Sequence, residues 1–383
     1  MVFLISTPLV VLAVAGGLLG TSALARQQGV PQLAIFDDCV QLIRSAYVEP
    51  VDIDKVMDGA MRGLADGLDG SSAYLTPAQM KDVQANAPLA AGDPGLVITK
   101  AFYLRVVSVR DGSPAAKAGL RTGDYLRGID GQPTREMSAI EGTRLLHGAP
   151  GSKVTLSVFR NSAADIREIP VERGVLDAPL VTATPEPDGA VDLRVTSFAT
   201  GAAAQLGTAI DAARRNGATR LLLDLRGTAG GSFDEGIAAA RLFVKTGVIA
   251  IRGGREATDQ VKISANPGDG AVTLPTVVLI SNGTSGAAEV FAAALSGRER
   301  AELVGEPTAG IAGVQHLVPL PGGAGLWLTY QRYLTVDGQP IHERGVRPTV
   351  GVESPFVGFD DTPIANDPVL ARGLETLKKA KGA

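Results

Sequence analysis

Residues 221–243 read LLLDLRGTAGGSFDEGIAAARLF, and they carry the clearest structural pattern in the chain. The run Leu221–Leu225 is apolar apart from Asp224, which is typical of a strand buried on both faces of a parallel sheet. A glycine-rich turn follows at 227–231, and the spacing after it predicts a helix over Asp234–Phe243. Strand, turn and helix in this order indicate an α/β core.

The same order recurs further along the chain. A strand is predicted over Thr276–Ser281, a turn over Asn282–Gly286 and a helix over Ala287–Leu295. Upstream, Leu193–Phe198 reads as a strand and Ala202–Arg215 as a helix. Backbone amides at the N-termini of such helices can bind developing negative charge, so the turns are candidate site elements.

The chain before this core has two other patterns. Residues 33–68 carry apolar side chains at spacings of three and four, which predicts amphipathic helices interrupted at Glu49-Pro50. From Gly92 to Arg160 the pattern changes to short strands punctuated by glycine, with one helix predicted over Ser138–Leu146.

These patterns predict a multidomain α+β protein with N-terminal helices, a β-rich domain and an α/β core. We expect the N-terminal helices to be available for self-association into a homo-oligomer. The predicted segments are a leader at 1–25, a helical segment at 33–80, a β-rich domain at 88–165, the α/β core at 170–355 and a helical tail at 365–383.

The leader carries no charged side chain from Met1 to Ala25 and ends in Ala23-Leu24-Ala25, which fits a signal peptide. The uncharged stretch is also long enough to span a bilayer if it stays uncut, so a membrane anchor is the alternative. Both interpretations predict an exported protein, periplasmic or attached to the cell envelope.

Composition excludes several classes of function. The chain has 36 basic and 40 acidic side chains, without the basic excess that nucleic-acid binding needs. Its three histidines and its one cysteine show no metal-ligand spacing, so we expect neither a metal nor another cofactor. We expect Cys39 to be a small buried apolar residue and Trp327 to lie in the core.

The β-rich domain resembles a PDZ domain of the bacterial type. The resemblance rests on Gly112–Leu120, which reads GSPAAKAGL, on Gly123-Asp124 and on Ile129-Asp130-Gly131. It implies binding of extended peptides or protein C-termini as an added strand. The carboxylate-binding loop of that family corresponds to Gly95, Leu96, Val97 and Ile98, but the first glycine of the loop is Pro94 here, which has no N–H to donate.

The α/β core resembles that of C-terminal processing peptidases, also called tail-specific proteases. The resemblance runs through nearly the whole chain after the leader, in the order of the family. It rests on these sequence motifs: Leu223-Asp224-Leu225-Arg226 before Gly230-Gly231, Glu289-Val290-Phe291-Ala292, Val304-Gly305-Glu306-Pro307-Thr308, Val314-Gln315 and Gly345-Val346-Arg347-Pro348.

This resemblance implies a serine nucleophile, a lysine base, a nearby glutamine and glycine amides that form an oxyanion hole. Carried over to this chain, the nucleophile position holds Gly286 and the base position holds Ile311, while Gln315 is retained. Gly230 and Gly231 correspond to the oxyanion-hole turn, although positive φ would also require glycine there. Because glycine cannot attack a carbonyl and isoleucine cannot accept a proton, we expect an inactive homologue that binds peptides.

The alternative is an active serine endopeptidase with an atypical site. No lysine occurs between Lys262 and Lys378, so the fallback would be Ser285 as nucleophile with His316 beside it. We favour plainer roles, with Ser285 capping a helix and His316 facing outward on a strand. Likewise, we interpret Asp224 and Arg226 as a salt bridge at the end of a strand.

Overall fold

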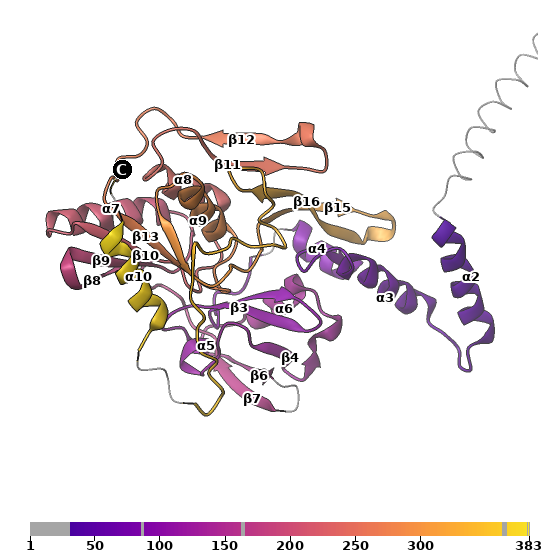
Figure 1. Cartoon of the computed structure of the whole chain (residues 1–383). Helices are drawn as coiled ribbons and strands as arrows, with labels where there is room; N and C mark the ends of the chain where they lie inside the picture. The colour runs from indigo at the N-terminus through magenta and orange to yellow at the C-terminus, as the bar shows by residue number, and fades with distance from the viewer. Residues whose placement is uncertain (1–30, 86–87, 162–164, 362–365, 381, 383) are drawn as a thin grey trace, which may run out of the picture. The chain divides into compact units, whose positions relative to one another are not determined.

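The computed structural model describes residues 31–85, 88–161, 165–361, 366–380 and 382 (Figure 1). The described residues divide into two compact units, with the boundary between Met61 and Arg62. The leader predicted over residues 1–25 lies outside the described residues. Within the described part of the chain, no helix is both long and apolar enough to cross a membrane.

The N-terminal helices form as the sequence predicts. Helix α2 spans Pro31–Ala46 and helix α3 spans Ile53–Asp66, with the interruption at the expected Glu49-Pro50. Cys39 on α2 is exposed, so the prediction of a buried cysteine is wrong. A helical period marks an apolar face, but it does not supply the element that would cover that face.

The PDZ-like domain is built around one sheet with the strand order β2-β3-β4-β6-β7, with β5 paired to β4. Strand β2 lies at the edge of this sheet, and helix α6 packs against it. The elements are β2 (Leu96–Lys100), β3 (Leu104–Val109), α5 (Pro114–Lys117), β4 (Tyr125–Ile129), β5 (Gln132–Pro133), η1 (Thr134–Glu136), α6 (Ala139–Leu146), β6 (Lys153–Phe159) and β7 (Ile166–Glu172).

The α/β core contains a six-stranded sheet in the order β17-β14-β13-β10-β9-β8. All neighbours in it are parallel except β8, which is antiparallel to β9. The strands are β8 (Val181–Pro185), β9 (Ala190–Val195), β10 (Arg220–Asp224), β13 (Thr276–Ile280), β14 (Glu302–Gly305) and β17 (Val350–Gly351), with η2 (Pro187–Gly189) between β8 and β9.

Helices cover both faces of this sheet. Leu221 and Leu223 pack with α7 (Ala202–Arg215), α8 (Phe233–Arg241) and α9 (Ala287–Gly297). Leu222, which points to the other face, packs with the C-terminal helix α10 (Pro368–Lys379). Burial on both faces explains why β10 reads as a continuous apolar run.

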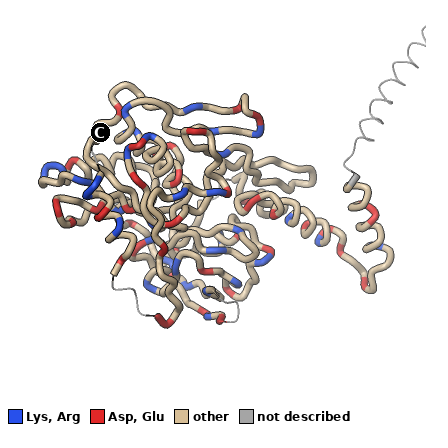
Figure 2. The backbone as a smooth tube through the Cα atoms, viewed as in Figure 1, with Lys and Arg blue, Asp and Glu red and all other residues tan. Residues whose placement is uncertain are grey.

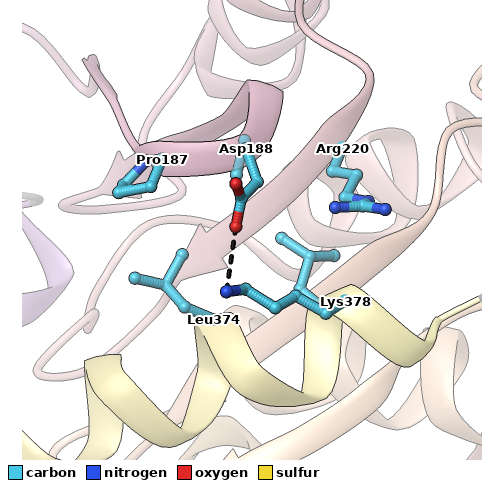
Figure 3. Close-up of a pocket in the computed structure, with 7 residues that line it drawn as sticks. Pro187, Asp188, Arg220, Leu374 and Lys378 are labelled. Carbon is cyan, nitrogen blue, oxygen red and sulfur yellow. Dashed lines mark ion pairs between the residues drawn. The ribbon is translucent and has the colours of Figure 1, made fainter.

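Helix α10 is also held by charge. Lys378 Nζ lies 2.9 Å from the carboxylate of Asp188 in η2, at a small cavity of about 100 Å³ that Leu374 and Arg220 also line (Figure 3). The hydrogen bond from Lys378 lowers the pKa of Asp188. None of the candidate site residues lines this cavity, so we interpret it as part of the surface against which α10 packs.

A further sheet has the order β1-β16-β11-β12, with β15 paired to β16. Its strand β1 lies inside the segment at 33–80 that the sequence predicts to be helical, so that prediction is incomplete. The remaining elements are β1 (Ala73–Leu75), α4 (Pro77–Gln84), β11 (Val248–Gly253), η3 (Ala257–Asp259), β12 (Val261–Ser264), β15 (Gly313–Pro319), η4 (Pro321–Gly323) and β16 (Gly325–Leu334).

Charges of both signs are interspersed along the described chain (Figure 2). Several of them fix the ends of strands. Arg226 lies 2.7 Å from Asp224 at the end of β10 and 2.6 Å from Asp367, the N-cap of α10. The predicted salt bridge between Asp224 and Arg226 is therefore confirmed, and it extends to the C-terminal helix.

Candidate functional site

The turn between β13 and α9 holds its last residue in an unusual conformation. Gly286 has φ 64° and ψ −120°, a backbone geometry that side-chain-bearing residues adopt only under strain. A Cβ built on Gly286 would find its nearest heavy atom, the carbonyl oxygen of Ile311, at 3.7 Å. Strained strand-to-helix turns of this kind present the nucleophile in α/β-hydrolases. The turn therefore has room for a side chain, and glycine adopts its geometry without strain.

One buried carboxylate joins the nucleophile position to the base position. Glu289 accepts backbone N–H bonds from Gly286 at 2.9 Å, from Gly310 at 2.7 Å and from Ile311 at 2.7 Å. The hydroxyl of Thr308 donates to the same carboxylate. Burial raises the pKa of Glu289, while these donors act in the opposite direction. Glu289 thus holds the two loops in a fixed relation.

Ser285 and His316, the residues of the alternative site, do not form a pair. Ser285 is buried, and its N–H donates to the carbonyl of Thr228 at 2.9 Å. His316 is exposed and packs edge-on against Tyr330. The prediction that Ser285 caps α9 is wrong, because the helix starts one residue later and the Glu289 carboxylate takes the N–H of Gly286.

The glycine-rich turn lies beside this site and needs its glycines for backbone reasons. Gly230 has φ 77° and Gly231 has φ 88°. A Cβ on Gly231 would lie only 2.0 Å from the carbonyl group of Phe198, so no side chain fits there. The bond from Ser285 N–H to Thr228 brings this turn against the turn that precedes α9. The two turns that the sequence singles out are therefore neighbours.

Gln315 belongs to a polar chain on β15 and β16. Its Nε2 donates to Thr329 Oγ1 at 3.1 Å, and the Thr329 N–H donates to Ser72 Oγ at 3.2 Å. Ser72 comes from the junction before β1, far from Gln315 in the sequence. Sequence reasoning named Gln315 but neither Thr329 nor Ser72, and the only signal for Ser72 was the resemblance that runs through nearly the whole chain after the leader.

The same junction contributes a buried acid–histidine contact. Asp69 accepts the N–H groups of Ser71 at 2.8 Å and Ser72 at 2.6 Å, and its other oxygen lies 3.5 Å from His342 Nε2. Burial would raise the pKa of Asp69, but His342 and the two N–H donors hold it well below its usual range. These contacts fix the junction against the loop at 341–345, so we interpret the role of the junction at the site as structural.

The expected peptide groove runs between β2 and α6. Pro94 precedes it without an N–H, and the N–H of Gly95 already donates to the Asp93 carboxylate at 2.7 Å. A cavity of about 360 Å³ lies between β2 and α6 and extends to Ile311 and Trp327. Trp327 is partly buried: it packs against the small apolar cluster of Ala73, Leu75 and Met80 and also lines this cavity, so its expected place in the core is confirmed in part.

Two family models match the chain in the order that the structure shows. The model for PDZ domains matches residues 105–160. The model for peptidase family S41 matches residues 191–352. The first match falls in the sheet that contains β2, and the second spans the turns before α8 and α9.

Relatives and a solved structure agree with these matches. The carboxy-terminal processing protease CtpA of Bacillus subtilis is 32% identical over 319 residues, which are 82% of this chain and 67% of the relative. The carboxy-terminal-processing protease of Bartonella bacilliformis is 30% identical over 371 residues, 92% of this chain and 85% of the relative. The photosystem II D1 C-terminal processing protease superposes with a TM-score of 0.68 at 26% identity, over 85% of this chain and 94% of that one. This chain belongs to peptidase family S41 and carries a PDZ domain.

Proposed function

We propose that this chain is a catalytically inactive member of its family that binds extended peptides or protein C-termini through its PDZ domain. The observation that carries the proposal is the pair of residues at the reactive positions, Gly286 and Ile311. Neither residue can attack a carbonyl or accept a proton. The sequence has no lysine between Lys262 and Lys378 that could replace the missing base. Without both groups the serine–lysine mechanism has no first step.

The surroundings of the two positions support a retained scaffold. Glu289 still bonds to both loops, Gln315 keeps a hydrogen-bond partner, and the glycine turn still packs beside Ser285. These contacts are present although the reactive side chains are absent. This supports a role in binding, because binding depends on the shape of a site and does not need a nucleophile.

The edge of the PDZ sheet supports the same conclusion. An extended peptide can add to β2 through main-chain hydrogen bonds, and side-chain pockets along α6 can select it. Neither contact requires Gly286 or Ile311 to react. We place this activity in the cell envelope, because residues 1–25 have the pattern of a signal peptide or an anchor.

Self-association through α2 and α3 is part of the proposal. Several apolar side chains on and between these helices are exposed, among them Leu33, Leu42, Val48 and Leu64. Apolar surface of this kind is typical of contact with another protein chain. Light scattering during gel filtration should show an oligomer, and Leu33→Glu with Leu42→Glu should shift it towards the monomer.

The test combines three measurements on one preparation of the full chain. We expect no labelling by a fluorophosphonate probe and no cleavage of β-casein, which is unfolded, while an active serine peptidase run in parallel shows both. Fluorescein-labelled peptides should still bind in fluorescence anisotropy. Labelling and cleavage that Ser285→Ala abolishes would overturn the proposal and establish the alternative active site.

A further inference from the structure

The sheet that contains β16 has a gap along one edge. On this edge β1 pairs with residues 325–327 and β11 pairs with residues 332–334. Strand β15 pairs with residues 325–332 and therefore occupies the opposite edge. Among the described residues, no strand pairs with residues 328–331 on the first edge. Because an open strand edge is a template for pairing with another chain, this gap is a candidate binding site.

A cavity of about 600 Å³ occupies the gap. It is lined by residues 328–332 of β16, by Asp69 and Ser72 before β1, and by Gly253 and Arg255 at the end of β11. The residues at the nucleophile, base and oxyanion positions do not line it, and neither does the PDZ sheet. Its volume lies within the range of sites that hold small ligands. The cavity is therefore separate from both candidate sites described above.

His342, which also lines this cavity, lacks hydrogen-bond partners. Its side chain is 7% exposed, and neither ring nitrogen has a hydrogen bond within the described part of the chain. The contact of Nε2 with Asp69 is 3.5 Å long. The next residue, Glu343, has φ 62°, and strain of this kind clusters at functional sites. Since buried polar groups normally have a partner, the ring indicates a ligand that hydrogen-bonds to it.

The charges at the two ends of the gap differ in sign. Asp69 lies at the end next to β1, and the exposed Arg255 and Arg332 lie at the end next to β11. Neither arginine has an ion pair with a residue that the structure describes. A peptide strand parallel to β16 would place its amino group at the acidic end and its carboxylate at the basic end. The antiparallel direction would bring like charges together.

The two flanking strands also limit the length of the ligand. At about 3.3 Å per residue, the open stretch of β16 is about 13 Å long. A longer chain would have to leave the sheet at β1 or at β11.

We propose that this gap binds a short peptide of up to about four residues, with free amino and carboxyl ends, as a strand parallel to β16. Main-chain hydrogen bonds to β16 and to His342 hold the peptide, and the charges at its two ends set its direction. This site does not depend on peptide binding by the PDZ domain.

The test uses the tetrapeptide Ala-Val-Ala-Val with free ends, its N-acetyl form and its C-terminal amide. Isothermal titration calorimetry measures the affinity of each for the full chain. We expect each blocked form to bind about fivefold more weakly, because each loses one ion pair at the surface. Hydrogen exchange followed by mass spectrometry should show slower exchange in fragments that span residues 328–331 when the free peptide is present.

Variants assign the preference to the ends of the gap. Arg255→Gln with Arg332→Gln should remove the difference between the acid and the amide. Arg214→Gln with Arg215→Gln, the same change of charge at exposed positions of α7, should retain it. His342→Ala should weaken all three forms alike, and circular dichroism checks that each variant is folded.

The location of slowed exchange separates this site from the PDZ groove. Equal affinity of the free and blocked forms, no binding, or slowed exchange in β2 alone would overturn this inference and leave the proposed function standing. Slowed exchange at residues 328–331 without any in β2 would support this site even if the PDZ domain binds no peptide.

Discussion

Among single residues, Gly286 has the backbone geometry of a turn that presents a nucleophile, but it has no side chain that could react. The turn keeps φ 64° and ψ −120°, and the space beside it is open to 3.7 Å. Once no nucleophile is needed at such a turn, glycine relieves the strain of holding a side chain there. Under the proposed function, glycine at this position both removes the nucleophile and stabilises the fold.

The first prediction follows from this strain. Gly286→Ser and Gly286→Ala should each lower the free energy of unfolding by about 1–3 kcal/mol. Urea unfolding measures the effect. Gly351→Ser is the matched control, because Gly351 has open space around its missing Cβ and its φ lies outside the left-handed region. If Gly286→Ser unfolds at the same urea concentration as the parent, the turn relaxes and the strain argument fails.

Asp192 on β9 gives a second prediction at this scale. Burial, reinforced by the nearby charge of Asp224, raises the pKa of Asp192 to about 7, and one of its oxygens is buried without a hydrogen bond. Because the folded pKa lies above the unfolded one, proton uptake at Asp192 stabilises the fold at low pH, and this contribution is lost as the pH rises towards 7.

Asp192→Asn should therefore be more stable than the parent at pH 8.5, by about 1–3 kcal/mol, and the difference should shrink at pH 5.5. Urea unfolding of both proteins at the two pH values provides the check. A gain of equal size at both pH values would mean that Asp192 does not titrate with the fold.

At the scale of elements, the loop before β2 departs from what the PDZ resemblance implies. Pro94 cannot donate, and the Asp93 carboxylate already holds the N–H of Gly95. A peptide carboxylate placed there would meet a like charge and fewer free donors. This arrangement favours extended segments over free C-termini within the proposed function.

A third prediction follows for peptide ends. A fluorescein-labelled peptide that binds the PDZ domain should bind with similar affinity, within about threefold, whether it ends in a carboxylate or in an amide. Asp93→Asn should improve the binding of the acid form selectively, because it removes the like charge. Anisotropy titrations of both forms decide the matter. A loss of tenfold or more on amidation would show that the loop captures carboxylates after all.

Elements also show where sequence patterns succeed. Helices α6, α7 and α9 and strands β10 and β13 lie within two residues of their predicted bounds, because their apolar pattern is local information. Strand β1 was missed, because its three residues Ala73–Leu75 become a strand only by pairing with Trp327 and its neighbours. A segment this short carries no period of its own.

In the whole molecule, the candidate site also combines features that the sequence predicts with features that depend on long-range contacts. Gly286, Ile311 and Gln315 could be named from the resemblance, because motif order preserves the position of each residue. The contacts of Asp69 with His342 could not, because they join parts of the chain that only the complete fold brings together. Glu289 is an intermediate case. The sequence predicts that it lies at the start of a helix, but only the structure shows that its carboxylate accepts the N–H groups of both Gly286 and Ile311.

The last prediction uses the whole site. Gly286→Ser combined with Ile311→Lys should restore weak cleavage of β-casein and labelling by a fluorophosphonate probe. The lysine would enter the cavity between β2 and α6, where burial lowers its pKa towards the neutral form that a base requires. Activity should therefore rise with pH through that lowered pKa. Each single change should stay inactive, because each supplies only one half of the dyad.

The strain at position 286 and the burial of a lysine both destabilise the double variant, so its fold is checked first by circular dichroism and urea unfolding. Adding Gln315→Ala tests whether the restored activity uses the retained frame, and it should lower the rate without unfolding the chain. A folded double variant that neither cleaves nor labels would show that the scaffold has drifted beyond the geometry of catalysis. In that case Glu289 still holds the loops that carry positions 286 and 311 together, but a serine and a lysine at these positions do not come close enough to react. The site would then have lost the geometry of catalysis as well as its reactive groups.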